Sequence, residues 1–215
     1  MSVGKYQTSA GIEGEYQPGS RKRVLRNLLG ITSKQAMDEA EFEALIGVQD
    51  CYLDGVTEDT VFTANLLRQM HREWLGSIYE WAGSYRTVEM SKAGFTWPPA
   101  FRVAANMESF ERDILRKMTP FRLEGLDAGC VALAQVHAEF LLIHPFREGN
   151  GRMARWLTDL MCLQAGLPQP EYGFVGRGSR QNQQAYLQGV IRGYEQDYRA
   201  LADFFQKSLE RSTTR

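Results

Sequence analysis

The sequence predicts a mainly α-helical protein that contains one β-hairpin. Apolar residues recur every three or four positions along most of the chain, and glycines and prolines stand where these helical patterns stop. One segment instead alternates apolar and polar residues around a glycine-containing turn. With 215 residues, no repeat and no low-complexity linker, the chain is long enough for one sizeable domain with its own core.

The first part of the chain is expected to be irregular and then helical. Residues 1–14 are polar and glycine-rich and are expected to form an irregular lead-in. A basic amphipathic helix is predicted from Ser20 to Leu29, ending near Gly30. Ser33 is a candidate N-cap of the next helix. The apolar positions of that helix are Met37, Phe42, Leu45 and Ile46.

A long helix is predicted over residues 57–81, with Thr57 or Asp59 near its start. Its apolar residues recur every three or four positions. They are Leu66, Met70, Trp74, Ile78 and Trp81.

The C-terminal half is predicted to be helical throughout. Asp127 is a candidate cap for a helix, and a further helix from Arg152 stops at Gly166. The last helical stretch, residues 183–209, is expected to bend near residues 189–193. The apolar stripe of the helix that follows Asp127 runs through Leu133, Val136, Phe140 and Ile143.

Residues 86–101, RTVEMSKAGFTWPPAF, break the helical pattern. Val88 and Met90 alternate with polar residues, and Phe95 and Trp97 follow a glycine-containing turn. This pattern predicts a hairpin, and the two prolines exclude a central strand. A lone hairpin in a helical protein has an unpaired edge, which accepts an extended peptide as an additional strand. The alternative is a hairpin that only covers the core.

Composition and charge are those of a soluble globular protein. Hydrophobic residues make up 43% and charged residues 24% of the chain, and the net charge is −1. No overall basic field recruits nucleic acid or an anionic membrane, so neither is expected as a partner. The N-terminus lacks an apolar signal segment and no membrane-length apolar run is expected, which together predict a cytoplasmic protein. The three cysteines are not closely spaced and predict neither a disulfide framework nor a zinc cluster.

Residues 144–152, HPFREGNGR, concentrate groups that are suited to binding phosphates. Gly149 and Gly151 permit backbone conformations and close approaches that side chains forbid. Successive amides that open onto a helix form an anion cradle, which the helix dipole strengthens. Glu148 offers a hard oxygen ligand, and magnesium typically uses one carboxylate together with substrate phosphates.

The same segment carries a base and two guanidinium groups. Arg152 and Arg155 are three residues apart on one face of the predicted helix, where they suit further phosphates. His144 has an unperturbed pKa of about 6.5 and accepts a proton near neutrality. Taken singly, these residues also fit a helix cap or a charged surface, but their coincidence favours a phosphate site. His71 and His137 are expected to pack or to form hydrogen bonds.

HPFREGNGRMAR, residues 144–155, matches in full the HxFx(D/E)GNGRxxR signature of Fic domains, enzymes that transfer AMP from ATP onto hydroxyl side chains. Residues 67–95 resemble that family's helix and target-docking flap. The resemblance covers residues 15–207 and implies a catalytic domain there, followed by a tail at residues 208–215. It implies a Fic-type helical bundle with one β-hairpin flap next to the active-site loop.

The resemblance also implies a role for each residue of the motif. His144 is implied as the general base for the target hydroxyl, and Phe146 as the apolar anchor that holds the loop against the core. Glu148 would hold Mg²⁺ between the α- and β-phosphates of ATP. The remaining residues would bind phosphates, with Gly149, Asn150 and Gly151 at the α-phosphate and Arg152 and Arg155 at the β- and γ-phosphates.

Further residues are implied in the adenine pocket, the flap and regulation. Tyr186 and Tyr194 are candidates for the adenine pocket. The target would pair with the main chain of the flap residues Thr87, Val88, Glu89, Met90, Ser91 and Lys92. Many members are inhibited by an [S/T]xxxE[G/N] helix, and residues 9–14 fit these letters. Gly11 lies inside that helix and few residues precede it, so a separate small antitoxin-like inhibitor protein is expected instead.

The sequence therefore predicts a protein adenylyltransferase that moves AMP from ATP onto a Tyr, Thr or Ser of a target protein and releases pyrophosphate. The alternatives are transfer of another nucleotide or phosphate-containing group, removal of AMP, and a non-catalytic peptide-binding module. The complete GNGR sequence favours a nucleotide whose α-phosphate lies in the cradle. The base of that nucleotide, the target, its modified residue and the oligomeric state stay open.

Overall fold

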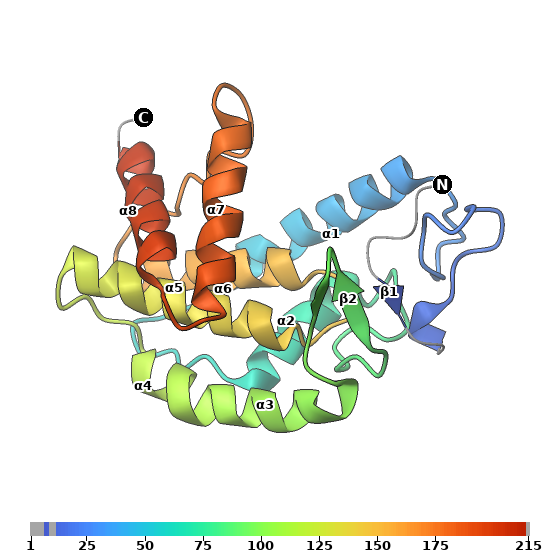
Figure 1. Ribbon diagram of the computed structural model, residues 1–215, viewed down its shortest axis with the longest axis horizontal. Helices are drawn as coiled ribbons and strands as arrows, with labels where there is room; N and C mark the ends of the chain where they lie inside the picture. Colours follow the sequence, from blue (N-terminus) through green and yellow to red (C-terminus); the bar gives the residue numbers. More distant parts are fainter. Residues whose placement is uncertain (1–6, 9–11, 214–215) are drawn as a thin grey trace. The chain divides into compact units, whose positions relative to one another are not determined.

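The computed structural model describes residues 7–8 and 12–213, and its architecture is mainly helical as predicted (Figure 1). The chain divides into two compact units, each assembled from segments that are distant in the sequence. Unit 1 comprises Met1–Asp54, Ala64–Glu108 and Ile143–Asn150. Unit 2 comprises Gly55–Thr63, Ser109–Leu142 and Gly151–Arg215.

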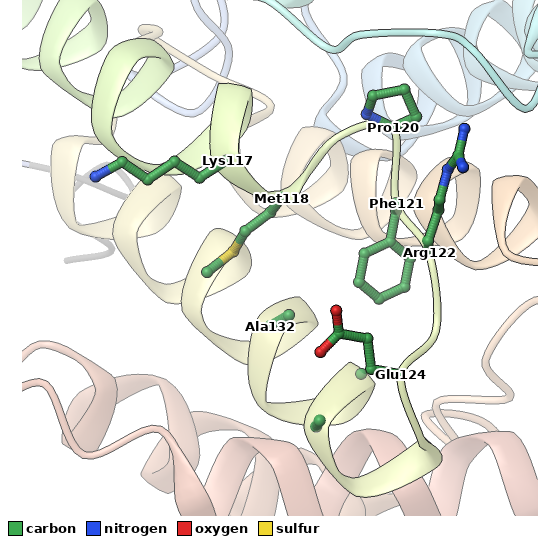
Figure 2. A pocket seen from close by; sticks show the side chains of 9 residues that line it. Lys117, Met118, Pro120, Phe121, Arg122, Glu124 and Ala132 are labelled. Atoms are coloured by element: carbon green, nitrogen blue, oxygen red, sulfur yellow. The ribbon is translucent and has the colours of Figure 1, made fainter.

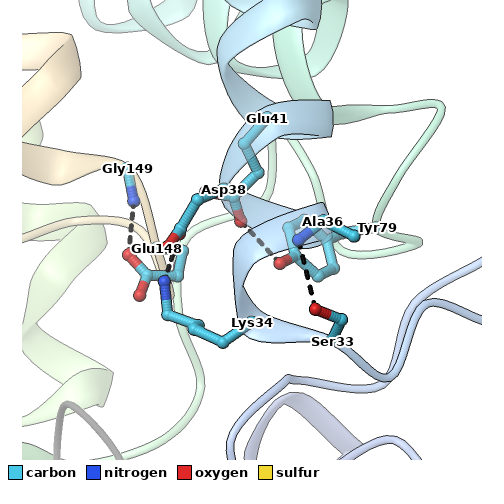
Figure 3. A network of polar contacts seen from close by, with 8 residues as sticks. All are labelled: Ser33, Lys34, Ala36, Asp38, Glu41, Tyr79, Glu148 and Gly149. Carbon is cyan, nitrogen blue, oxygen red and sulfur yellow. Dashed lines mark hydrogen bonds and ion pairs between the residues drawn. The ribbon is translucent and has the colours of Figure 1, made fainter.

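Unit 1 is built around α1 (Lys34–Gly55) and α2 (Ala64–Leu75). The Ser33 hydroxyl accepts the amide of Ala36 at 3.4 Å, so Ser33 caps α1 as predicted (Figure 3). The indole of Trp74 donates to the carbonyl of Glu41 at 2.8 Å, and the Tyr79 hydroxyl donates to the Glu41 carboxylate at 2.6 Å. These buried hydrogen bonds fasten α1 to α2 and to the segment that follows it.

The predicted hairpin is present and belongs to a small antiparallel sheet. Its strands are β1 (Gln7–Thr8), β2 (Met90–Lys92) and β3 (Phe95–Thr96), in the order β1-β2-β3. Ala93 and Gly94 have φ values of 49° and 83°, as a two-residue hairpin turn requires.

The hairpin buries one face, which confirms the alternation seen in the sequence. Val88 and Met90 are each 1% exposed and pack with Trp97, while Thr87 and Glu89 are exposed. Phe95 packs against this cluster from the other strand. We refer to residues 87–97 as the flap.

Unit 2 is mainly helical. After η2 (Ala100–Arg102) and most of α3 (Val103–Phe110), which belong to unit 1, the chain enters unit 2 at Ser109 near the end of α3. It then runs through the π-helix η3 (Glu111–Leu115), α4 (Arg116–Met118), α5 (Leu126–Ile143), α6 (Asn150–Gln164), α7 (Ser179–Gly193) and α8 (Arg199–Thr213). The stripe of α5 is buried as predicted, at Leu133, Val136, Phe140 and Ile143. Helices α7 and α8 lie side by side (Figure 1).

The bend expected near residues 189–193 is a complete break between α7 and α8. Gln196 in the connection has a φ of 64°. At Gly193 an added Cβ would lie 2.5 Å from the Cβ of Ala138, so only glycine lets the end of α7 approach α5 this closely.

Among the described residues, α5 is the one helix that is long and apolar enough to cross a membrane, judged by length and composition. The expectation that no such run exists was therefore wrong. In the structure 56% of this helix is buried, and a core helix passes the same test. His137 on α5 bonds to Thr158, and Glu139 accepts from the Tyr198 hydroxyl at 2.5 Å, so polar groups on this helix are used in packing.

The helix predicted from Ser20 to Leu29 is not formed. The Asn27 side chain instead accepts the amide of Ile31 and donates to its carbonyl, both at 2.9 Å. Side chains of this kind compete with helical hydrogen bonds by holding the backbone in a turn. Arg21 and Lys22 also have positive φ values, of 53° and 60°.

The helix predicted over residues 57–81 was wrong at both ends, because α2 covers only Ala64–Leu75. The Thr60 hydroxyl accepts the amide of Thr57 at 2.9 Å and closes a turn before the helix. On α1, the two apolar residues Phe42 and Ile46 are 60% and 47% exposed, so the predicted core face was also too wide.

The predicted boundaries of the catalytic region differ from the observed elements at both ends. Helix α8 continues to Thr213, and Ser208 and Leu209 are 0% and 4% exposed, so the predicted tail contains core residues. The lead-in predicted as irregular contains β1 and the short 3-10 helix η1 (Ile12–Gly14). The rest of that lead-in, residues 1–6 and 9–11, lies outside the described residues.

The cysteines are all free thiols with different exposure. Cys51 on α1 is exposed, whereas Cys130 on α5 and Cys162 on α6 are buried. Burial raises the pKa of Cys130 to about 11 and raises the pKa of Cys162 further.

Candidate functional site

His144 follows α5 directly and opens the segment 144–149, which we call the motif loop. Its φ of 52° is left-handed, a region that histidine adopts more readily than most other residues with a side chain. The residue is 5% exposed. Its imidazole lies 4.1 Å from the ring of Trp97, measured between centroids, so the flap packs directly on the predicted base.

A buried arginine that the sequence analysis missed holds the start of this loop. Arg86 is 2% exposed, and burial lowers its pKa. Its Nε donates to the His144 carbonyl at 2.8 Å, and its Nη atoms donate to the carbonyls of Val88 at 3.0 Å and Pro98 at 2.6 Å. Its own amide donates to the Pro145 carbonyl at 2.8 Å. A charged residue beside an alternating strand normally indicates a solvated position, so no sequence signal distinguished it.

His71 supports the middle and the end of the motif loop. Its ring stacks on Phe146 with centroids 3.9 Å apart, and Phe146 is 0% exposed, which is the placement that an anchor requires. The Gly83 amide donates to Nδ1 of His71 at 2.9 Å, so the ring proton lies on Nε2. Nε2 lies 3.1 Å from the carbonyl of Glu148, to which it donates.

Two further side chains close the motif loop. The Asn150 amide group accepts from the Phe146 amide at 2.9 Å and donates to the Phe146 carbonyl at 2.7 Å. Its side chain therefore shapes the loop, which leaves its main chain at the start of α6 for the predicted phosphate role. Arg147 is 3% exposed and donates to the Glu13 carbonyl at 2.7 Å.

Glu148 is half-buried, and its Oε2 accepts the amide of Gly149 at 3.0 Å (Figure 3). Within residues 7–8 and 12–213, no group of three or more His, Cys, Asp or Glu side chains is arranged to hold a metal by itself. A carboxylate with this exposure suits Mg²⁺, which completes its coordination with phosphates and water.

The two motif glycines have different reasons to be glycine. Gly149 has a φ of 81°, and a Cβ there would lie 2.7 Å from the Trp74 ring. Gly151 lies in the first turn of α6, where an added Cβ would meet only the Arg155 guanidinium at 3.7 Å, an ordinary contact. The fold thus demands Gly149, whereas the atoms described around Gly151 would accept a Cβ.

The start of α6 suits an anion. Its first turn carries no acidic residue, and both motif arginines, Arg152 and Arg155, are half-buried on it. The Arg155 guanidinium lies 6.0 Å from the ring centroid of Tyr172 and 5.7 Å from that of Phe174. These rings limit the directions in which the guanidinium can point.

A buried carboxyl lies one turn beyond Arg155. The Tyr172 hydroxyl donates to Asp159 at 2.8 Å and lies 3.3 Å from the carbonyl of Arg155. Burial raises the pKa of Asp159 to about 7, although the Tyr172 hydrogen bond and the charge of Arg155 act in the opposite direction.

The two adenine-pocket candidates, Tyr186 and Tyr194, both contact other residues of unit 2. The Thr158 hydroxyl donates its proton to the Ala154 carbonyl, so its oxygen accepts a hydrogen bond from Nδ1 of His137. The ring proton of His137 is therefore on Nδ1, and Nε2 accepts from the Tyr186 hydroxyl at 2.8 Å. Burial lowers the pKa of His137 to about 3. Tyr186 is 7% exposed, while Tyr194 is half-buried with its hydroxyl 3.4 Å from the Leu141 carbonyl. Their adenine roles stay predictions.

The flap does not have the unpaired edge that its sequence predicted on the β2 side. Strand β2 is the middle strand, with Ser91 opposite both Gln7 of β1 and Thr96 of β3. A two-residue strand without an alternating pattern cannot be recognised in the sequence, which explains the error. Docking of a target on residues 87–92 stays a prediction that must account for β1.

Glu13 contacts both the flap and the motif loop. Its carboxylate accepts the Thr87 amide at 2.9 Å, and its carbonyl accepts from Arg147. It is 8% exposed and lies in the three-residue η1. Ser9 and Gly11 of the inhibitor-like pattern lie outside the described residues.

A cavity of about 300 Å³ in unit 2 contains none of the predicted site residues (Figure 2). It is lined by Lys117, Met118, Pro120, Phe121, Arg122, Glu124, Ala128, Gly129 and Ala132.

The sequence profile of the Fic/DOC family matches residues 61–162. The probable protein adenylyltransferase y4lH of Sinorhizobium fredii is 30% identical over 193 residues, which cover 86% of this chain and 90% of that protein. The protein adenylyltransferase VbhT of Bartonella schoenbuchensis is 29% identical over 146 residues, 66% of this chain but only 30% of that protein. The chain thus spans less than a third of the Bartonella relative.

Solved Fic-domain structures share the fold. BepC from Bartonella tribocorum, determined with bound AMPPNP, has a TM-score of 0.70 at 18% identity and covers 86% of this chain and 91% of its own. The Fic domain of a Bep effector from Bartonella sp. AR 15-3 has a TM-score of 0.71 at 19% identity and covers 88% of each chain. The Sinorhizobium relative, together with the profile match, shows that the chain belongs to the Fic/DOC family.

Proposed function

We propose that this protein transfers AMP from ATP onto a Tyr, Thr or Ser hydroxyl of a target protein and releases pyrophosphate. The single observation that carries the proposal is the complete motif at residues 144–155. Its base-bearing loop is held by buried contacts, and Gly151 at the start of α6 leaves room for a ligand. The names of the relatives, protein adenylyltransferases, support AMP as the transferred group.

In the proposed reaction the target hydroxyl attacks the α-phosphorus of ATP. A bond forms between the hydroxyl oxygen and phosphorus, and the bond from phosphorus to the pyrophosphate oxygen breaks. His144 takes the hydroxyl proton. The main chain at the start of α6 faces the developing negative charge, and Arg152 and Arg155 bind the departing phosphates. Positioning and electrostatics supply the acceleration.

Magnesium is proposed as the metal and Glu148 as its protein ligand. The half-buried carboxylate is a hard oxygen donor, as Mg²⁺ prefers. When bound, the ion neutralises the phosphates and fixes their alignment. The AMPPNP bound in the BepC structure supports a nucleotide as co-substrate in this fold.

The proposed partners are a target protein that docks at the flap and a small antitoxin-like inhibitor protein, in the cytoplasm. Support for a separate inhibitor comes from Glu13, whose carboxylate bonds to the flap amide of Thr87.

The test is a labelling experiment with purified protein, cell lysate and Mg²⁺. Four reactions contain ATP, GTP, CTP or UTP labelled at the α-phosphate, and a fifth contains ATP labelled at the γ-phosphate. We expect a protein band labelled from α-labelled ATP only, lost with excess chelator and absent with His144→Ala. Label from the γ-position would indicate phosphate transfer, and label from another nucleotide would change the substrate. No label from any nucleotide would contradict the proposal.

A further inference from the structure

We infer that Arg86 is a positioning residue for the base: its buried guanidinium fixes the main chain of His144 together with both ends of the flap. The inference rests on the proposed function, because it concerns the residue that would accept the proton. It assigns to Arg86 no contact with ATP or with the target.

The described hydrogen bonds of the Arg86 side chain all go to main-chain carbonyls. Within the described residues its hydrogen bonds go to four of them, those of His144, Val88 and Pro98 and, at 3.4 Å, that of Ile143. Two of these carbonyls lie where α5 passes into the motif loop. The other two lie before β2 and after β3. One side chain therefore joins the motif loop to both ends of the hairpin.

The residue type follows from this geometry. Burying a positive charge is unfavourable unless its hydrogen bonds are satisfied. A guanidinium offers five donors in a rigid plane and can serve carbonyls from separate segments at once, whereas an ammonium is a compact point charge. Lysine at this position would keep the positive charge but would lose the planar set of donors that reaches several carbonyls at once.

The consequence reaches the imidazole through the main chain of His144 and of the residue that follows it. The carbonyl of His144 accepts from the Arg86 side chain, and the carbonyl of Pro145 accepts from the Arg86 amide. These contacts hold the left-handed turn at His144. Pro98, another acceptor, is adjacent to Trp97, whose ring packs on the imidazole at 4.1 Å. Arg86 thus fixes the backbone of the base and of its packing partner.

Two substitutions and one matched control separate positioning from general stability. Arg86→Lys keeps the charge, and Arg86→Gln removes it. Tyr79→Phe removes a buried hydrogen bond to Glu41 on α1 in the same unit but keeps the aromatic ring that stacks on Trp81. A merely structural role of Arg86 predicts that all three variants behave alike.

The first readout is independent of activity. The chain has three histidines, so ring ¹⁵N spectra of the full chain contain three sets of signals, and His144→Asn identifies that of His144. We expect Arg86→Lys to move the His144 signals and the midpoint of their pH titration, while the signals of His137 in unit 2 stay in place. Tyr79→Phe should move neither.

The second readout is transfer of AMP from α-labelled ATP. We expect Arg86→Lys to lower kcat by about 100-fold, the range for a misplaced base, and to leave the KM for ATP within about twofold. In a further variant, Arg86→Ala, which removes the whole guanidinium, added guanidinium ion should restore part of the activity. Tyr79→Phe should retain the wild-type kcat even if it melts at the same temperature as Arg86→Lys.

Each outcome decides between separate claims. If the His144 signals move as expected but the wild-type protein transfers no nucleotide, the proposed function fails and the positioning role stands. If transfer is real, and Arg86→Lys keeps both its rate and its His144 signals, the positioning role is wrong. Failure of Arg86→Lys and Arg86→Gln to fold would assign Arg86 to the core and would also overturn the inference.

Discussion

The motif loop and the start of α6 are consecutive in the chain but are supported in different ways. In the loop, the carbonyls of His144, Pro145 and Phe146 all accept hydrogen bonds from other side chains or from the Arg86 amide, and Phe146 is stacked on His71. At the start of α6, Gly151 leaves open space and Arg155 is steered by aromatic rings. The described contacts of the motif loop therefore come from distant segments of unit 1, whereas an added side chain at Gly151 would meet only the Arg155 guanidinium.

The difference agrees with the chemistry required of each segment. A base must lie within hydrogen-bond distance of the proton it takes, so small displacements are costly. Phosphate binding relies on amides, a helix dipole and long arginine side chains, which tolerate adjustment when the ligand arrives. Substitutions in the two segments should therefore produce different kinds of defect.

The largest effect is expected at the base. His144→Ala should lower AMP transfer by about 10²–10⁴-fold and leave ATP binding intact, because it removes the proposed proton acceptor and keeps the proposed phosphate-binding residues. His144→Asn is the matched variant, since asparagine tolerates the left-handed backbone and preserves the loop. Transfer and AMPPNP affinity are measured for both. Equal labelling by either variant and the wild type would remove His144 as the base.

The two glycines test the comparison directly. Gly149→Ala should lower the free energy of unfolding by about 2–4 kcal/mol, because it combines a positive φ with a Cβ 2.7 Å from Trp74. Gly151→Ala should leave stability unchanged or raise it by up to about 1 kcal/mol, since alanine is the better helix former. It should weaken AMPPNP binding by about tenfold, equivalent to about 1.4 kcal/mol.

Urea denaturation and calorimetric titration measure these two effects. If Gly149→Ala and Gly151→Ala lose the same amount of stability, the fold requires glycine at both positions. Unchanged AMPPNP affinity in Gly151→Ala would show that no phosphate approaches it.

The stability of the protein should depend on pH through Asp159, which lies one turn after Arg155 on α6. Its folded pKa of about 7 exceeds the value of 3.8 expected when unfolded, so the folded state keeps a proton that the unfolded state has released. The contribution of Asp159 therefore falls by about 1.4 kcal/mol per pH unit from about pH 4 to about pH 7 and then levels off. His137 acts in the opposite direction, because its pKa is about 3 when folded against 6.5 when unfolded.

Asp159→Asn separates these two contributions. With the contribution of Asp159 removed, that of His137 should make stability rise between about pH 4 and pH 6.5, whereas the wild-type profile should be flatter. Urea unfolding at several pH values between 4 and 8 provides the measurement. Parallel profiles for variant and wild type would mean that Asp159 is ionised in the folded protein.

The smallest effect on transfer is expected at Glu13. Glu13→Ala removes the acceptor of the Thr87 amide and should cost about 1–2 kcal/mol of stability. Transfer should stay within about threefold, a change below roughly 0.7 kcal/mol in the barrier, if the carboxylate holds the flap and is not the inhibitor, as we propose. Glu15→Ala, which breaks an exposed ion pair with Arg26, is the control. A sharp activation by Glu13→Ala alone would establish an internal inhibitor.

The sequence identified the residues with the clearest local signals. The motif predicted the site residues, which stay predictions, and the alternation at Val88 and Met90 predicted the hairpin that the structure contains. The sequence did not reveal which residues hold the motif loop, because these residues are distant from it in the chain. Arg86 lies 58 residues from His144, and His71 lies 77 residues from Glu148. No periodicity marks a side chain whose partners are main-chain carbonyls of another segment.

Errors in the helices had a different origin. Side-chain hydrogen bonds of Asn27 and Thr60 close turns where a helical pattern continues in the sequence. The pairing of Gln7 with Ser91 joins segments more than 80 residues apart and has no sequence signal. Such contacts depend on the assembled tertiary structure and cannot be derived from local propensity.

The unequal exposure of the thiols makes this protein suitable for selective chemical labelling. A maleimide reacts with thiolate, so at neutral pH the native chain should take up one label, at Cys51 on α1, while the two buried thiols with raised pKa values stay unmodified. Unfolded chains should take up three. The labelling stoichiometry read by mass spectrometry thus counts the unfolded fraction of any variant described above, and a dye at Cys51 gives unit 1 a fluorescent reporter without an engineered cysteine.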